Sequence, residues 1–120
     1  MNVKKLSDDE LYARAVEYGR AALGWRRKFI GLLPEIFNRR LYKRRGFDSI
    51  FEFAAKLAGI SKEQVRLTLN MSEDFRSKPT LQSLLVNGEV SINKLTRVRS
   101  VATPKNEEFW ATQVQVLPNR

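Results

Sequence analysis

Cysteine and histidine are both absent from the 120-residue sequence. Without cysteine the chain can form no disulfide bond and offers no thiolate as a nucleophile or metal ligand. Without histidine it lacks the side chain that most often serves as a general base and as a transition-metal ligand. Most nuclease, protease and deaminase mechanisms need one of these groups. We therefore expect a protein that is not an enzyme, with no catalytic residues, no metal site and no cofactor.

Long apolar runs and alternating apolar–polar runs are absent as well. No stretch approaches the roughly 18 apolar residues of a membrane-spanning helix, and the opening MNVKKLSDDE lacks the apolar region of a signal peptide. No run alternates as a half-buried strand does, and no internal repeat is evident. We expect residues 1–120 to form a single, compact all-α domain in the cytoplasm, with no membrane or small-molecule partner.

Acidic residues are few, with 13 Asp and Glu against 22 Lys and Arg, and the net charge is +9. The excess is concentrated in residues 1–46, where 12 basic residues face five acids. Residues 47–78 are neutral, and residues 79–120 carry +2. A domain this basic usually binds a polyanion. The alternative is a basic surface without a dedicated partner.

Several of the acids occur as adjacent pairs, namely Asp8-Asp9, Glu73-Asp74 and Glu107-Glu108. On a helix, neighbouring side chains diverge by about 100°, so the two members of a pair point in different directions. We interpret these residues as surface acids rather than as a metal-binding or catalytic pair.

Residues 7–45 are predicted to form a long, basic helical segment. Ser7 and Glu10 have the spacing of a capping box, which marks a helix start. Apolar residues then recur at every third or fourth position, at Leu11, Ala15, Tyr18, Ala22, Trp25, Phe29 and Leu32 or Leu33. We expect Trp25 to lie in the core.

A break is expected near the end of this segment. Gly31 and Pro34 interrupt the apolar pattern, and Pro34 should either kink the helix or start a new one. The continuation would run through Leu41 and Tyr42 and end at Gly46.

Residues 46–120 are predicted to hold a helix-turn-helix followed by C-terminal helices. We expect helices over 49–58 and 61–75, with Ala55 buried where they cross, Gly59 in the turn and Val65 facing inward. The second helix of such a unit often enters the DNA major groove. The alternative is a helix pair that only builds a core.

Two groups of residues are candidates for DNA contacts. The first turn and outward face of helix 61–75 carry Ser61, Lys62, Gln64, Arg66 and Asn70. Gln and Asn can bond adenine, and Arg can bond guanine, although the same residues suit an ordinary solvated face. The densest basic run carries Arg39, Arg40, Lys43, Arg44 and Arg45, which we interpret as phosphate-binding rather than as charge that only complements a helix end.

The segments LSDDELYARA, FNRRLYKRRGFDSIFEFAAKLAGIS and NGEVSINKLTRV resemble the N-terminal helical region that precedes the nuclease module in bacterial HNH endonuclease family proteins. Residues 46–101 also look like the helical DNA-binding core of ParB/KorB-type partition proteins. The resemblance implies a DNA-binding domain that targets a nuclease-like protein or acts as a small regulator.

The chain departs from this family in two ways. The nuclease motif depends on histidines, which this chain lacks, so the resemblance does not carry nuclease activity over. Family members often carry several Arg or Lys along the second helix, where this chain has Leu67, Asn70, Glu73 and Asp74.

Taken together, the sequence predicts a helix-turn-helix protein that binds duplex DNA through a basic surface, associates with the nucleoid and does no chemistry on DNA. The alternative is a protein-interaction or oligomerisation module, and homodimer formation stays open.

Overall fold

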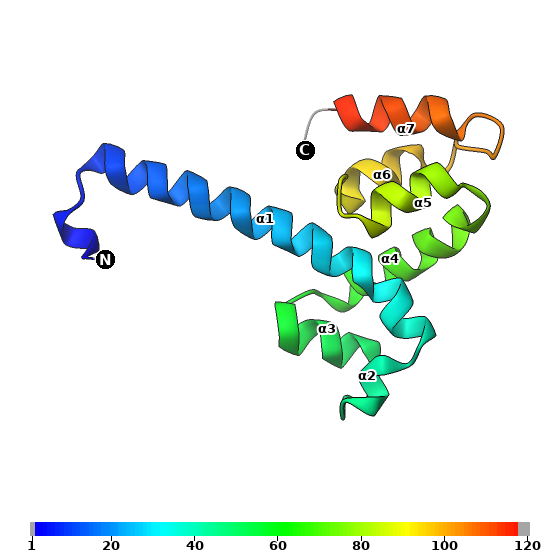
Figure 1. The fold of residues 1–120 in the computed structure, drawn as a ribbon, viewed down its shortest axis with the longest axis horizontal. Coiled ribbons are helices and arrows are strands. Elements are labelled where there is room, and N and C mark those ends of the chain that lie inside the picture. The colour runs from blue at the N-terminus through cyan, green and yellow to red at the C-terminus, as the bar shows by residue number, and fades with distance from the viewer. Residues whose placement is uncertain (1, 118–120) are drawn as a thin grey trace.

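The computed structural model describes residues 2–117, and every regular element within that range is a helix (Figure 1). In chain order these are η1 (Val3–Lys5), α1 (Asp8–Asn38), α2 (Leu41–Arg44), α3 (Ile50–Ala58), α4 (Lys62–Asp74), η2 (Phe75–Ser77), α5 (Pro79–Val86), α6 (Ile92–Arg99) and α7 (Glu107–Val116). The all-α prediction is confirmed. The molecule measures 55 × 40 × 19 Å, because α1 extends well beyond the other helices.

Helix α1 begins with a complete capping box. The Ser7 hydroxyl accepts a hydrogen bond from Glu10 N (3.2 Å), and Ser7 N donates one to Glu10 Oε1 (2.9 Å). The bond from the Ser7 backbone holds the pKa of Glu10 below its usual value.

Pro34 does not start a new helix, which was one of the two outcomes expected for it. Helix α1 runs through Pro34 to Asn38, and the chain breaks instead at Arg39 and Arg40, where Arg40 is left-handed with φ 54°. Pro34 and the neighbouring Leu33 are buried, so packing against the core offsets the hydrogen bond that proline cannot donate.

The prediction that Trp25 lies in the core is wrong. Its side chain is 70% exposed and borders an open groove with Ala58 of α3 rather than the core. The first buried residue of α1 is Ile30, five residues further on. The apolar pattern correctly indicated a helix, but it did not show which part of that helix the core covers.

Two glycines let α1 approach the end of α5 closely. A Cβ atom on Gly31 would lie 2.4 Å from Val86 O and 2.7 Å from Leu85 O. A Cβ atom on Gly88, whose φ is +70°, would lie 2.9 Å from Lys28 N. Gly31 therefore does not interrupt the helix as the sequence suggested; it allows backbone-to-backbone contact.

Helices α3 and α4 form a pair joined by a three-residue turn. Gly59 caps α3 with φ 64°, as predicted, and Val65 is fully buried on α4. Ala55, however, is exposed, and Ala54 is the small residue that is fully buried. The buried face of α3 consists of Ile50, Phe53 and Ala54, so the crossing point lies one residue earlier than the spacing indicated.

The interpretation of all paired acids as surface residues fails at Glu107. This carboxylate is 6% exposed, and its Oε1 accepts a hydrogen bond from Leu81 N (3.0 Å) in the first turn of α5. It therefore caps α5 from α7. The pair on α4 is engaged in ion pairs, because Asp74 binds Arg99 and Glu73 binds Arg76 at 3.1 Å.

We expect Gly31→Ala to destabilise the fold by about 2 kcal/mol, because the added methyl group meets carbonyl oxygens of the α5 backbone. Gly24→Ala on the same helix is the control, since nothing lies within 4 Å of its Cβ position. That change should stabilise the helix by about 0.5–1 kcal/mol. Urea unfolding followed by circular dichroism checks both values, and equal effects would contradict the close approach.

We expect Glu107→Ala to lower the free energy of unfolding by about 1–3 kcal/mol, because it leaves Leu81 N buried without an acceptor. Glu108→Ala removes the neighbouring, exposed carboxylate and should change stability by less than about 0.5 kcal/mol. Both residues lie in the first turn of α7, so any helix-dipole effect is shared. Thermal melts that match for the two variants would exclude the capping role.

Candidate nucleic-acid interface

The basic run predicted to bind phosphate forms an ordered corner between α1 and α3. We call it the basic turn, and it consists of Arg39, Arg40, Lys43, Arg44 and Arg45, all of which are exposed. Tyr42 anchors it, because its ring is buried and stacks on Phe37 with centroids 6.2 Å apart. The left-handed Arg40 separates α1 from α2, so the cations are spread around a corner rather than along one helix.

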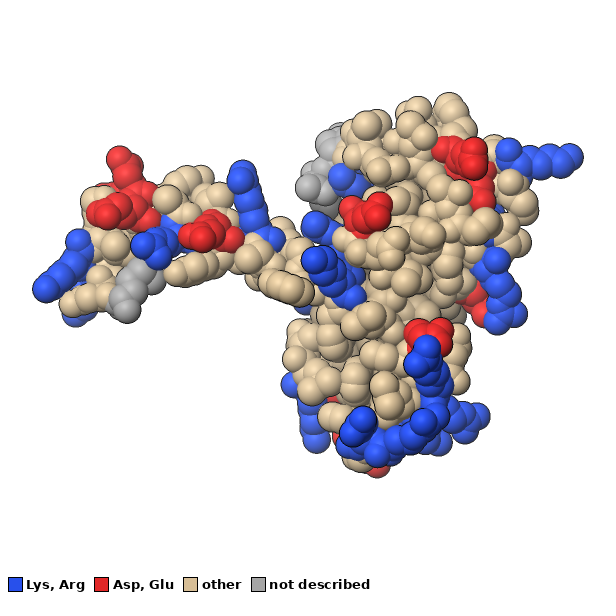
Figure 2. Space-filling model, in the orientation of Figure 1, with Lys and Arg blue, Asp and Glu red and all other residues tan. Residues whose placement is uncertain are grey.

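The basic turn carries little compensating negative charge. Arg39 Nε pairs with Glu35 Oε2 at 2.7 Å, and both side chains are more than 60% exposed. Arg44 Nη2 donates to the Arg39 carbonyl (2.9 Å), which leaves its charge unpaired. The side chains of Arg40, Lys43 and Arg45 form no ion pair within the described residues. Figure 2 shows Lys and Arg side chains gathered at the lower end of the molecule, where Figure 1 places α2.

The predicted contact residues of α4 are divided between two surfaces. Lys62, Arg66 and Asn70 are exposed and recur every fourth residue, so they form one stripe. Ser61 begins the helix, with its hydroxyl accepting from Gln64 N (3.2 Å). The Gln64 side chain itself lies on another face of the helix.

Two cations of this stripe lie over one aromatic ring of α3. Lys62 Nζ is 5.2 Å and Arg66 Cζ is 5.7 Å from the centroid of Phe51. The ring holds both side chains near the first turn of α3. Phe51 follows Arg45 by six residues, so their Cα atoms are at most about 21 Å apart. The basic turn and the start of α4 therefore fall within one short stretch of surface.

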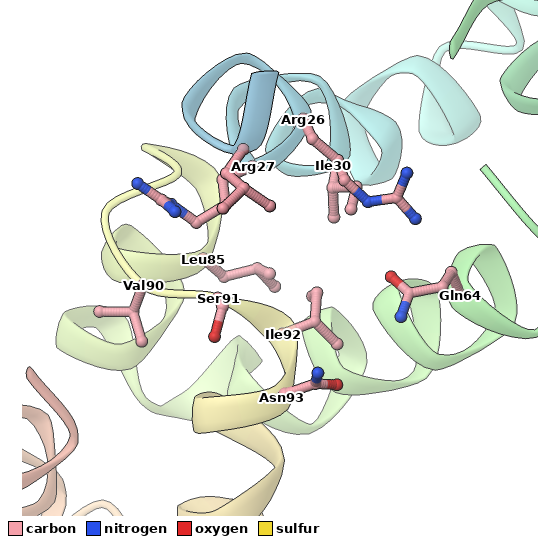
Figure 3. Close-up of a pocket in the computed structure, with 10 residues that line it drawn as sticks. Arg26, Arg27, Ile30, Gln64, Leu85, Val90, Ser91, Ile92 and Asn93 are labelled. Atoms are coloured by element: carbon pink, nitrogen blue, oxygen red, sulfur yellow. The ribbon is translucent and has the colours of Figure 1, made fainter. Parts of the chain in front are cut away.

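Gln64 lines a cavity of about 140 Å³ between α1, α4 and α6. Figure 3 shows Arg26 reaching toward Gln64 from α1, with Asn93 of α6 on the other side. Sequence reasoning missed Arg26 and Asn93, because only the tertiary fold brings them to α4. The sequence did contain one signal for a second basic site, the run Arg26-Arg27-Lys28. We interpreted this run only as flanking a buried Trp25.

Arg27 has a structural role at the edge of this cavity. Its Nε donates to the Gly88 carbonyl (3.2 Å), which fixes the α5–α6 turn against α1. Arg26 is therefore the basic residue of α1 that remains available to a ligand at the cavity mouth.

Exposed acids near this surface are Glu35, Asp48, Glu63 and Glu73, and the half-buried Glu52 pairs with Lys56 at 3.7 Å. Within residues 2–117 no cluster of three or more acids is arranged to hold a metal ion. In the same range no helix is both long and apolar enough to cross a membrane.

No family model, curated protein or solved structure matches this chain.

Proposed function

We propose that this chain binds duplex DNA, with the basic turn on the phosphate backbone and the start of α4 beside it. The observation that carries the proposal is the basic turn itself: five exposed cations with one paired carboxylate, held in place by a buried tyrosine. Because the buried Tyr42 holds the backbone of the turn before binding, little backbone conformational entropy is lost when phosphates are neutralised.

The stripe on α4 extends this surface. Lys62 and Arg66 lie over the ring of Phe51, and the Cα atom of Phe51 is at most about 21 Å from that of Arg45. This span is shorter than the roughly 34 Å of one turn of B-DNA. One duplex face can therefore contact both groups. Arg66 and Asn70 have side chains suited to guanine and adenine edges.

The neighbouring acids limit base reading by this helix. Glu63 and Glu73 flank the stripe, and like charges repel the phosphates that a deeply inserted helix must pass. We therefore assign most of the affinity to phosphates and expect modest sequence preference. Binding that depends mainly on phosphates suits a targeting domain of a nuclease-like protein or a small regulator.

We expect the variant Arg40→Gln, Lys43→Gln, Arg45→Gln to bind duplex DNA more weakly at all sequences. If each side chain contacts one phosphate, the plot of the logarithm of the binding constant against the logarithm of the salt concentration should become less steep, by about 2.7. Fluorescence anisotropy with mixed duplexes at several salt concentrations measures both quantities.

The matched control is Lys4→Gln, Lys5→Gln, Lys105→Gln. It removes the same charge from exposed positions in η1 and in the α6–α7 loop, which Figure 1 places far from α2. It should leave the slope nearly unchanged. Equal losses in the two variants would show that only net charge matters, and no binding by the parent at low salt would overturn the proposal.

We also expect bound DNA to stay intact. Incubation of supercoiled plasmid with magnesium or manganese should produce no nicked or linear product, since the chain offers no histidine or thiolate for hydrolysis. Nicking that a chelator abolishes, and that is lost on one acidic substitution, would contradict this expectation.

A further inference from the structure

The projecting part of α1 carries an exposed apolar seam. Its members are Leu11, Ala15, Tyr18, Ala22, Trp25, Phe29 and Leu32. Their spacing alternates four and three residues, which is the heptad repeat of a coiled coil. Except for the half-buried Phe29, every member is exposed, and Tyr18 and Trp25 are 52% and 70% exposed. At 1.5 Å per residue, the seam is about 32 Å long.

This part of the helix lacks the support that usually stabilises helices. Most helical stability in proteins comes from packing of an apolar face, and residues 8–28 have almost none within the described chain. Gly19 and Gly24 weaken the helix further, at roughly 1 kcal/mol each relative to alanine. Neither glycine has any neighbour within 4 Å of its Cβ position, so the fold of one copy does not require them.

The charge along the same stretch changes sign. Residues 8–17 hold four acids and one base, for a net charge of −3. Residues 18–28 hold four bases and no acid, for +4. Two copies of this stretch attract each other when they run antiparallel and repel when they run parallel. An antiparallel arrangement also aligns the helix dipoles favourably.

We propose that α1 of one copy pairs antiparallel with α1 of a second copy along this seam. The sizes of the seam residues favour one register of the two helices. In this register, the number of a residue and the number of the partner residue that faces it add up to 40. Ala15 then faces the partner's Trp25, Ala22 faces the partner's Tyr18, and Leu11 faces the partner's Phe29. A small residue meets each of the two largest side chains, as knobs-into-holes packing requires.

The surroundings of the seam fit this register. Its second half borders an open groove whose wall includes Leu32 of α1 and Ala58 of α3. Arg26 and Lys28 line the same groove, and Lys28 Nζ lies 4.8 Å from the Trp25 ring centroid. In this register the partner's acidic first turn, residues 8–10, faces residues 30–32, about one helical turn beyond Lys28. Because the other helices pack on the C-terminal part of α1, the two folded bodies would lie at opposite ends of the helix pair.

A membrane surface is the other class of apolar partner, and the charges disfavour it. A helix that lies on an anionic bilayer carries basic residues along its polar face. Here the first ten residues of α1 carry a net charge of −3, and they include the start of the seam.

Sedimentation equilibrium over a range of protein concentrations tests the pairing. We expect the parent chain to form a dimer and Ala15→Glu to remain monomeric over the same range, because the charge would be buried against the partner's Trp25. Ala13→Glu is the control: it makes the same change two residues away, on the exposed side opposite the seam. A monomeric parent, or equal dissociation by both variants, would overturn the proposal.

Cross-linking tests the orientation, because the chain has no cysteine of its own. In the antiparallel register Ala21 lies beside the two-fold axis, so Ala21→Cys should be linked to itself by a short bismaleimide. Ala15→Cys should not, since the partner's Ala15 lies far along the pair. The reverse pattern would show parallel pairing and overturn the proposal. So would a chain that stays monomeric in solution but sediments with anionic vesicles.

Discussion

The close approach of α1 to the end of α5 is the contact on which the rest of the structure depends. Gly31 and Gly88 bring the two backbones together, and Arg27 adds a hydrogen bond to the Gly88 carbonyl. Residues 27–38 of α1 are thereby fixed against α4, α5 and the start of α3. Because a helix is stiff, this one contact also sets where both of its ends lie.

The two ends of α1 then have different consequences. The C-terminal end delivers Arg39 and the basic turn to the corner beside α3, where Tyr42 and Phe37 stack and hold it. The N-terminal end extends away from the core and leaves its apolar seam exposed. The core thus uses only part of α1, and the proposed DNA surface and the proposed pairing surface lie at its opposite ends.

Local features of the fold could be predicted from the sequence, and features that depend on distant neighbours could not. Ser7 caps its helix as predicted, and Ser49 and Ser61 cap theirs with the same three-residue spacing, which is readable from the sequence. The positive φ of Gly59 is likewise local. Trp25 and Glu107 were misjudged, because their burial or exposure is decided by which helices reach them. The same reason explains why Gln64 lies beside Arg26 and Asn93, which come from other helices.

The two proposals constrain each other through the geometry of α1. In the antiparallel register the pair is centred at residue 20, so each Asn38 lies 18 residues from the centre. The two helix ends would then be roughly 54 Å apart. That separation exceeds the roughly 34 Å of one DNA turn. A dimer would therefore present its two basic turns either to sites more than one helical turn apart on one duplex or to two separate duplexes. The first arrangement gains affinity from both turns only when the DNA sites have this spacing.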